Sequence, residues 1–294
     1  MKIPWLAREQ LALHVEPIEL RAIVFKGARI LRWGAQPLRP QVLQQNLVAE
    51  PHAFHEALSQ LLTTLGISTA KTSLSFHHGR AIQRVLELPL VPDKLLAETV
   101  ERQARREFPL PLEEIYLTWQ QLPTQGNHRQ IFAVGLPRQS VDSYIAALQQ
   151  TQLKITSLDL KTLALARAVN HPQIIIVDLE STATKILLIR DFIPQIVRTI
   201  TLLDADKFSV QERAGQLIRE IQRMLDFHQS SRTASQPHWI PQICLTGALA
   251  PGNDLAAPLE AKWSLAHPQP TLTLPPDLPL LHYLPNLGLI MKES

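Results

Sequence analysis

Alternating and continuous runs of apolar residues predict strands and one helix in the first 80 residues. The expected strands lie at residues 11–25, as two strands around a tight turn at Glu16 and Pro17, and at residues 30–33 and 72–76. Residues 53–65 carry apolar side chains at helical spacing, and Gly66 follows where a C-terminal glycine cap belongs. The chain is therefore expected to open with three strands, a helix and a further strand.

The middle of the chain predicts a second group of elements. A strand at residues 82–88 ends at Pro89, and Pro92 and Asp93 open an amphipathic helix that runs to Glu107. The remaining elements expected in this region are strands at residues 115–121, 130–135 and 155–158 and helices at residues 139–149 and 160–169.

A hairpin opens the second half of the chain. Two apolar runs, at residues 174–177 and 186–189, flank a polar turn that holds Asp178, Glu180, Ser181 and Thr182. Two apolar runs this close together are typical of adjacent strands in the middle of a core sheet.

The rest of the second half repeats the order of the first. A strand at residues 195–203, a long amphipathic helix at 210–228 and a strand at 241–245 are expected after the hairpin. Residues 258–285 hold seven prolines and are expected to run irregularly over the surface, whereas the apolar residues 283–291 should dock onto the core. Each half thus has three strands, a helix and a strand, an order that many mixed α/β folds share.

The composition indicates a globular protein without a strongly charged surface. Of 294 residues, 45% are hydrophobic and the net charge is +3, and no basic run has interleaved aromatic residues, so we expect no nucleic-acid partner. The single cysteine, Cys244, allows no disulfide within the chain and fits a reducing cytoplasm. No apolar run approaches the roughly 20 residues of a membrane span, and the first ten residues lack the apolar centre of a signal peptide. We therefore expect a cytoplasmic protein with no direct membrane insertion, held at a membrane only through partners.

Four segments carry a pattern that spans nearly the whole chain. In residues 86–116, Leu88-Pro89 is followed by a helix rich in Glu and Arg and then by Pro109-Leu110-Pro111-Leu112-Glu113-Glu114. The others are the hairpin from Val177 to Arg190 with Arg198 after it, residues 218–227 with the later Leu245-Thr246-Gly247, and Leu287-Gly288-Leu289 near the end. In their order and spacing these segments resemble the PilM family, the actin-like proteins of type IV pilus assembly.

The resemblance implies an α/β fold of the actin-like (ribonuclease-H-like) type. This fold has two lobes around a cleft, a duplicated mixed β-sheet core, and here a small α+β subdomain inserted in the first half. The expected division is residues 1–81 and 157–171 for the first core subdomain, 82–156 for the insertion, and 172–294 for the second core subdomain with a reduced insertion and a C-terminal tail.

The resemblance also implies a nucleotide site, and the sequence departs from the family there. Actin-like ATPases hold phosphates with two Asp-x-Gly turns, because glycine lets backbone N–H groups approach the phosphate closely. Here the first turn contains Glu16 and Pro17, and the second has Glu180 in place of glycine. A carboxylate beside a polyphosphate is repulsive unless a metal ion bridges them. The resemblance therefore favours a degenerate site made of the remaining residues, which are Asp178, Ser181, Thr182 and Gly247, with ATP and Mg²⁺ bound weakly or not at all.

The leading hypothesis is a scaffold for type IV pilus assembly that is not an enzyme. In the family, a groove takes the N-terminal cytoplasmic peptide of the inner-membrane protein PilN. That groove should lie between residues 86–158 and the N-terminal core, and apolar side chains at residues 108–112 are candidates either for peptide contact or for ordinary packing. One alternative is a working ATPase that uses Asp178, Ser181, Thr182 and Gly247 with Mg²⁺. Another is the equivalent actin-like component of a type II secretion system.

A metal centre or a hydrolytic site is not indicated by the sequence. His52 with His55, and His77 with His78, lack the third and fourth ligands of a metal site, so we interpret them as surface or hydrogen-bonded side chains. Tryptophans such as Trp119 are interpreted as packing residues.

Overall fold

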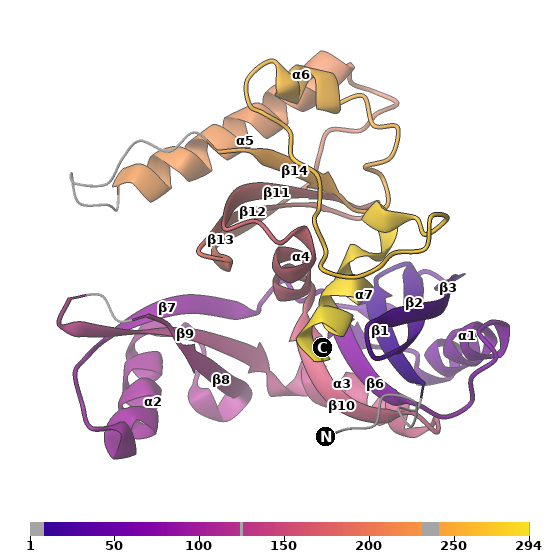
Figure 1. The fold of residues 1–294 in the computed structure, drawn as a ribbon, viewed down its shortest axis with the longest axis horizontal. Coiled ribbons are helices and arrows are strands. Elements are labelled where there is room, and N and C mark those ends of the chain that lie inside the picture. Colours follow the sequence, from indigo (N-terminus) through magenta and orange to yellow (C-terminus); the bar gives the residue numbers. More distant parts are fainter. Residues whose placement is uncertain (1–8, 124–125, 231–240, 294) are drawn as a thin grey trace.

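The computed structural model describes residues 9–123, 126–230 and 241–293, and it shows two lobes with a smaller unit beside the first (Figure 1). Each lobe is built on a mixed β-sheet, and two helices lie between the lobes. The expected order of three strands, a helix and a strand is confirmed in both halves of the chain.

The first lobe contains a sheet with the order β10-β6-β1-β2-β3. Its strands are β1 (Gln10–Glu16), β2 (Glu19–Lys26), β3 (Arg29–Pro37), β6 (Lys71–Phe76) and β10 (Lys154–Leu160). Strand β1 is antiparallel to β2 and parallel to β6, which makes the sheet mixed. Helices α1 (Pro51–Thr64) and α3 (Arg138–Gln149) pack on one face and bury residues such as Phe54 and Tyr144. A small ribbon of β4 (Leu43–Gln44) and β5 (Leu47–Val48) joins β3 to α1.

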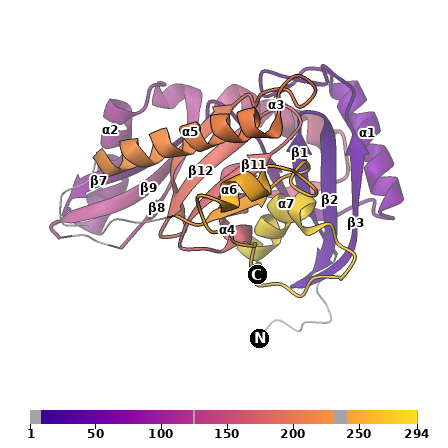
Figure 2. The ribbon, with the colours of Figure 1, turned by 90° about the horizontal axis from the view of Figure 1, so that it is seen from above.

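The second lobe repeats this arrangement in a sheet with the order β13-β12-β11-β14. Its strands are β11 (Gln173–Leu179), β12 (Thr184–Arg190), β13 (Ile193–Ile200) and β14 (Ile243–Thr246). Helix α5 (Val210–Ser230) covers the outer face and extends toward the side of the molecule that carries the smaller unit (Figures 1 and 2). Strand β13 was expected at residues 195–203, but it ends at Ile200 because its partner β12 begins at Thr184, opposite Ile200.

The smaller unit is an antiparallel sheet with the order β7-β9-β8 and one helix on its face. Its elements are β7 (Ile82–Pro89), α2 (Leu96–Glu107), β8 (Ile115–Gln121) and β9 (His128–Pro137), with short 3₁₀ helices at Asp93–Leu95 and Leu112–Glu114. We call this unit the insertion. The division of the chain with an inserted subdomain at residues 82–156 stays a prediction. Within that range, α3 packs in the core of the first lobe and β10 pairs with β6 of its sheet.

Two helices fill the space between the lobes. Helix α4 (Lys161–Val169) and helix α7 (Leu280–Glu293) pack on each other, and their apolar side chains join residues of both sheets in one cluster. Gly288 of α7 lies so close to α4 that a Cβ atom there would be 1.9 Å from the carbonyl oxygen of Ala164.

The prediction of an irregular course at residues 258–285 is wrong in part. Short helix α6 (Ala256–Glu260) overlaps its start, and α7 begins at Leu280 with Pro285 inside it. Pro285 has no N–H to give to the carbonyl of Leu281, and that carbonyl accepts the N–H of Gly247 instead, at 3.3 Å. The expected docking of the apolar C-terminal residues is confirmed, since Leu284, Leu287 and Ile290 are fully buried.

Candidate functional site

Strand alternation brings charged side chains to the place where the two lobes face each other. On β1, alternate residues from Leu11 to Val15 lie in the first core, so His14 and Glu16 point toward the second lobe. On β11, Ile174 and Ile176 join the cluster between the lobes, and Asp178 continues the same face. This face is apolar along most of both strands and becomes charged where each strand ends in a turn.

Lys161, the first residue of α4, lies among three carboxylates from both lobes. Its Nζ atom is 2.6 Å from Glu16, 2.6 Å from Asp178 and 2.8 Å from Glu180. The Lys161 side chain is 1% exposed, and those of its partners are at most 7% exposed. The contact with Glu180 is a hydrogen bond, and those with Glu16 and Asp178 are ion pairs at close distance.

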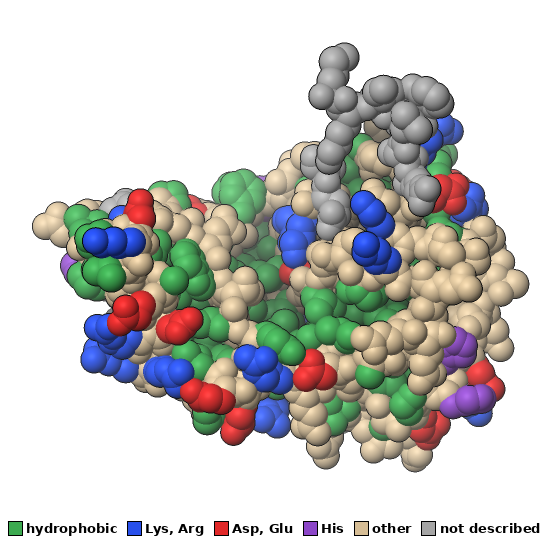
Figure 3. Space-filling model, turned by 90° about the horizontal axis from the view of Figure 1, so that it is seen from below, with side chains coloured by type: hydrophobic (Ala, Val, Ile, Leu, Met, Phe, Trp, Pro, Cys, Tyr) green, Lys and Arg blue, Asp and Glu red, His purple; other side chains and the backbone are tan. Residues whose placement is uncertain are grey.

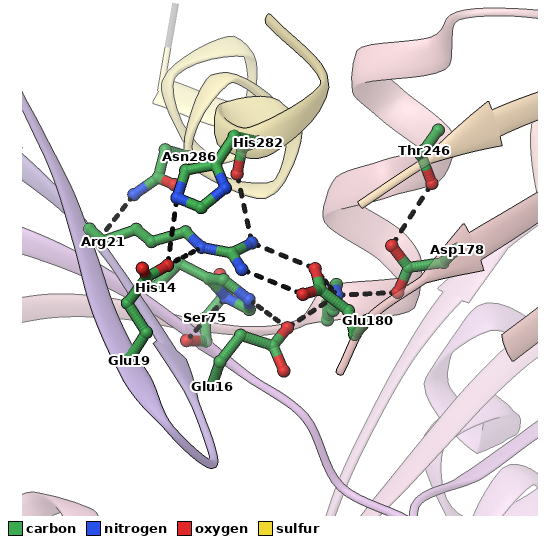
Figure 4. Close-up of polar contacts among 11 residues, drawn as sticks. His14, Glu16, Glu19, Arg21, Ser75, Asp178, Glu180, Thr246, His282 and Asn286 are labelled. Carbon is green, nitrogen blue, oxygen red and sulfur yellow. Dashed lines mark hydrogen bonds and ion pairs between the residues drawn. The ribbon is translucent and has the colours of Figure 1, made fainter. Parts of the chain in front are cut away.

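Arg21 of β2 makes a second bridge between the lobes (Figure 4). Its Nη1 and Nη2 atoms donate to the two oxygens of Glu180 at 3.0 and 2.9 Å, in the two-pronged geometry that suits guanidinium and carboxylate. Nε donates to Glu19 at 2.5 Å, and Nη1 also donates to the carbonyl of His282 in α7 at 3.1 Å. Arg21 therefore ties β2 to the β11–β12 turn and to the first turn of α7.

His14 completes the network on the side of the first lobe. Nε2 lies 2.8 Å from Glu16, and Nδ1 lies 2.8 Å from the Ser75 hydroxyl (Figure 4). Burial lowers the pKa of His14, so the imidazole is neutral. An ionised Glu16 can only accept, so Nε2 carries the hydrogen and Nδ1 accepts from Ser75.

Electrostatics keep this network charged in spite of its burial. Burial opposes the ionisation of Glu16, but Lys161, the hydrogen bond from His14 and the charge of Lys185 together outweigh burial and hold the pKa of Glu16 well below its usual value. Lys161 likewise lowers the pKa of Glu180 against the effect of burial. The carboxylates in turn outweigh burial at Lys161 and raise its pKa. Glu16, Lys161, Glu180 and Arg21, in this order, thus form a row of alternating charges that hold one another ionised at the junction of the lobes.

The predicted site residues are only partly brought together. Asp178 lies in the network, with the Thr246 hydroxyl donating to it at 3.2 Å. Gly247 follows β14 with φ of +94°, and a Cβ atom there would lie 2.3 Å from the Leu179 carbonyl oxygen, so the position requires glycine. Ser181 and Thr182 lie on the exposed turn, and none of the described hydrogen bonds comes from their side chains.

Sequence reasoning missed Arg21, Lys161 and Lys185. Each is a cation inside or beside an apolar run, and that pattern is the signal that could have found them. Lys185 of β12 is 4% exposed and lies opposite Asp178 in the register of the hairpin. Burial, and next the charge of Lys161, lower its pKa to about 8.

A groove runs between the insertion and the two lobes. It has a volume of about 650 Å³. It is lined by residues 118–123 of β8 and its turn, by one face of β9, by β10 and α4, and by residues 191–194, which form the β12–β13 turn and the start of β13. Seen from below, hydrophobic side chains gather in the hollow between the insertion and the body of the molecule (Figure 3). Trp119, interpreted from the sequence as a packing residue, is 36% exposed and lines this groove.

The apolar residues at 108–112 are packing residues of the insertion. Phe108 is 7% exposed and joins Val100, Ala104 and Ile115 in the core under α2, and Leu110 and Leu112 pack against the same core. Leu110 is only partly buried, and it also lines a second hollow of about 380 Å³ between the insertion and the first lobe, together with Leu47 and Ser140. The larger groove beside β8 is lined by other side chains.

A family model described as type IV pilus assembly protein PilM matches residues 12–208. Among curated proteins, no match was found. No helix within the described part of the chain combines the length and the apolar character of a membrane span.

Similar solved structures confirm the fold. A structure of the PilM–PilN type IV pilus biogenesis complex is 20% identical with a TM-score of 0.77, covering 97% of this chain and 98% of that chain. EutJ, an ethanolamine utilization protein from Carboxydothermus hydrogenoformans, is 10% identical with a TM-score of 0.54, covering 98% and 91%. The cytoplasmic domain of EpsL, from the type II secretion system of Vibrio cholerae, is 12% identical with a TM-score of 0.52, covering 97% and 94%. The predicted α/β fold of the actin-like type is thereby confirmed.

Proposed function

Because the chain belongs to the PilM family of type IV pilus assembly proteins, we propose that it is the actin-like scaffold of that machinery and binds the N-terminal cytoplasmic peptide of a PilN-like inner-membrane protein. The protein would then act in the cytoplasm, at the inner membrane, through this partner. The observation that carries the proposal is the groove beside the open edge of β8.

The groove is suited to an extended peptide. In the order β7-β9-β8, strand β8 is an edge strand, and consecutive residues 118–121, from both of its faces, line the groove. An edge strand presents unpaired backbone N–H and C=O groups, to which a peptide can add as a further strand. The volume of about 650 Å³ is within the range of ligand sites, roughly 300–1,000 Å³.

The side chains of the groove favour an apolar segment. Phe132, Val134 and Leu160 form a buried cluster at its base. Trp119 and Phe192, 36% and 52% exposed, lie on it from the insertion and from the second lobe. Three of the charged groups pair with one another, because Arg167 and Lys292 both contact Asp159, and the fourth, Asp191, lies 3.7 Å from Arg190. Binding would therefore rest on apolar contacts and backbone hydrogen bonds more than on charge.

We further propose that the scaffold holds its two lobes together without a nucleotide. Where actin-like ATPases hold phosphates, this chain has Glu16 and Glu180, which would repel phosphate oxygens. The cations that could offset them, Lys161 and Arg21, are bound to these same carboxylates at 2.6–3.0 Å. This arrangement supports a degenerate site and a protein that is not an ATPase.

A peptide titration tests the partner proposal. A synthetic peptide with the N-terminal cytoplasmic sequence of the PilN-like protein is titrated into the full chain in a calorimeter. Trp119→Ala is expected to weaken binding about tenfold or more, as loss of an aromatic anchor does. Phe208→Ala is the matched control, because Phe208 is an aromatic residue of similar exposure, 38%, away from the groove. Equal affinities for the two variants would contradict the assignment of the groove.

A titration with labelled ATP and Mg²⁺ tests the nucleotide proposal separately. We expect no saturable binding in the micromolar range, because the phosphate positions hold carboxylates already engaged with cations. Low-micromolar binding would favour the alternative, a working ATPase of the same machinery.

A further inference from the structure

A small polar cavity lies beside the ion network, on the side of the insertion. It has a volume of about 80 Å³ and is bounded by the start of α4, by β12 and β13, and by the loop after β6. Its polar lining comes from Lys161, Lys185, His77, His78, Gln83 and two threonines, and no carboxylate is among the described residues that line it.

Lys185 reaches this cavity with its hydrogen-bond donors unused. The residue is 4% exposed, and none of the hydrogen bonds and ion pairs within the described residues involves its ammonium group. Lys161 beside it differs, since its ammonium lies 2.6–2.8 Å from three carboxylates. A buried ammonium without a partner is costly, so the site has a strong tendency to take up a negative charge.

Helix α4 adds a second source of positive potential. The helix begins at Lys161, and Leu160, Lys161 and Thr162 line the cavity. No side chain caps its first turn, so the N–H groups of that turn have no partner within the helix. The N-terminus of a helix is a favourable place for an anion because of these N–H groups and the helix dipole.

We propose that this cavity binds a small tetrahedral oxyanion of the phosphate or sulfate type, held by the ammonium of Lys185 and the first-turn N–H groups of α4. The volume corresponds to two or three water molecules at about 30 Å³ each. A nucleoside does not fit, since ligand pockets of that kind measure roughly 300 Å³ or more. The site goes beyond the scaffold function and does not depend on the peptide groove.

The groups around Lys185 determine how binding depends on pH. Burial lowers the pKa of His77 to about 3 and that of His78 to about 4, so both imidazoles are neutral at neutral pH. His78 is also tied to the Ser140 hydroxyl at 2.8 Å. Lys161 remains charged and repels the ammonium of Lys185, whereas Glu16, Asp178 and Glu180, which are paired with Lys161, attract that ammonium and raise its pKa against the effect of burial. Since the pKa of Lys185 is about 8, anion binding is expected to weaken as the pH rises through that value.

Thermal unfolding of the full chain tests the site. Sodium phosphate replaces sodium chloride at constant ionic strength, near neutral pH, and sodium sulfate and ATP are run in parallel. At a tenfold excess over the dissociation constant, the melting temperature should rise by about 2–3 °C. Lys185→Met should abolish the rise. Lys207→Met, which removes a lysine that is 74% exposed on the surface, should keep it.

The possible outcomes distinguish the anion site from the proposal that the protein binds no nucleotide. A rise with phosphate and sulfate that is lost only in Lys185→Met supports the site, and broadening of the phosphorus NMR line of inorganic phosphate should follow the same variants. No rise beyond that in chloride, or an equal rise in Lys185→Met, overturns the site and leaves the scaffold proposal intact. Stabilisation by ATP alone overturns both the site and the nucleotide-free scaffold.

Discussion

Replacing Lys161 with methionine should strongly destabilise the fold. The substitution keeps an unbranched apolar side chain, one atom shorter, but leaves Glu16, Asp178 and Glu180 without the ammonium that they share at 2.6–2.8 Å. Arg21 still neutralises Glu180, so Glu16 and Asp178 carry most of the loss. Removing one partner of a buried ion pair costs about 3–5 kcal/mol. Because domains are stable by only about 5–15 kcal/mol, this is a large part of the total.

The effect of pH distinguishes a lost ion pair from a packing defect. In the wild type, the lowered pKa values of Glu16 and Glu180 stabilise the fold above about pH 4.3, and this contribution is lost as the pH falls through the folded-state values. In the variant, burial acts on Glu16 without Lys161 and raises its pKa above the unfolded value, whereas Arg21 still pairs with Glu180. The folded variant then binds more protons than the unfolded chain, so its stability rises relative to the wild type on acidification.

Urea unfolding of both proteins at about pH 7.5 and about pH 5 measures this difference. The loss of unfolding free energy should be about 3–5 kcal/mol at the higher pH and clearly smaller at the lower pH. Lys207→Met serves as the control, since an exposed ion pair contributes at most about 1 kcal/mol. A loss below about 1 kcal/mol for Lys161→Met, or an equal loss at both pH values, would refute the reasoning.

Two further substitutions test the packing between the lobes and the charge state of Lys185. Gly288→Ala places a Cβ atom 1.9 Å from the carbonyl oxygen of Ala164 and should cost about 3 kcal/mol in urea unfolding. Gly215→Ala in α5, where a Cβ atom meets only the flexible end of Arg219 at 3.3 Å, should instead stabilise by up to about 1 kcal/mol; equal effects of the two would contradict the close approach of α7 to α4. Without added phosphate, the wild type should gain about 3 kcal/mol between pH 8 and pH 10.4, because the unfolded chain keeps the Lys185 proton that the fold, with a pKa of about 8, releases. Lys185→Met should lack this rise, and a rise of the same size in the variant would contradict the burial of that charge.

The strands could be predicted from the sequence because each carries its own pattern. Alternation along β1 and the continuous apolar run of β11 identify them without knowledge of their neighbours. Helix α7 could not be predicted in the same way. In a sequence, Pro285 indicates a helix boundary, because proline cannot donate a hydrogen bond to the Leu281 carbonyl. In the structure this carbonyl accepts the N–H of Gly247, a residue far earlier in the chain.

The position of Asp178 at the junction of the lobes could be predicted, since it ends the apolar run of β11, next to the end of β14. The role of Gly247 in a site stays a prediction, since the structure gives only the close backbone approach that requires a glycine there. Ser181 and Thr182 share the turn after Asp178 but lie on its exposed side, and the sequence of a turn does not reveal which side its hydroxyl groups take. Lys161 could not be assigned from the sequence, because its partners lie on two different strands and the start of α4 meets them only when the lobes are in place.

The position of the ion network relates the proposed loss of the nucleotide to the proposed peptide groove. In a two-lobed fold, whatever binds both facing turns determines how the lobes are arranged. Here Arg21, Lys161 and their carboxylates, together with α4 and α7, form those contacts within the chain itself. The groove depends on the same arrangement, because Phe192 and its neighbours on the second lobe complete a surface whose other walls are the insertion and the first lobe. Lobes joined by internal ion pairs would keep this surface formed before the peptide arrives. Such preorganisation lowers the entropic cost of binding, so replacement of the phosphate-binding corners by charged side chains is consistent with a protein whose task is to present a permanent docking groove.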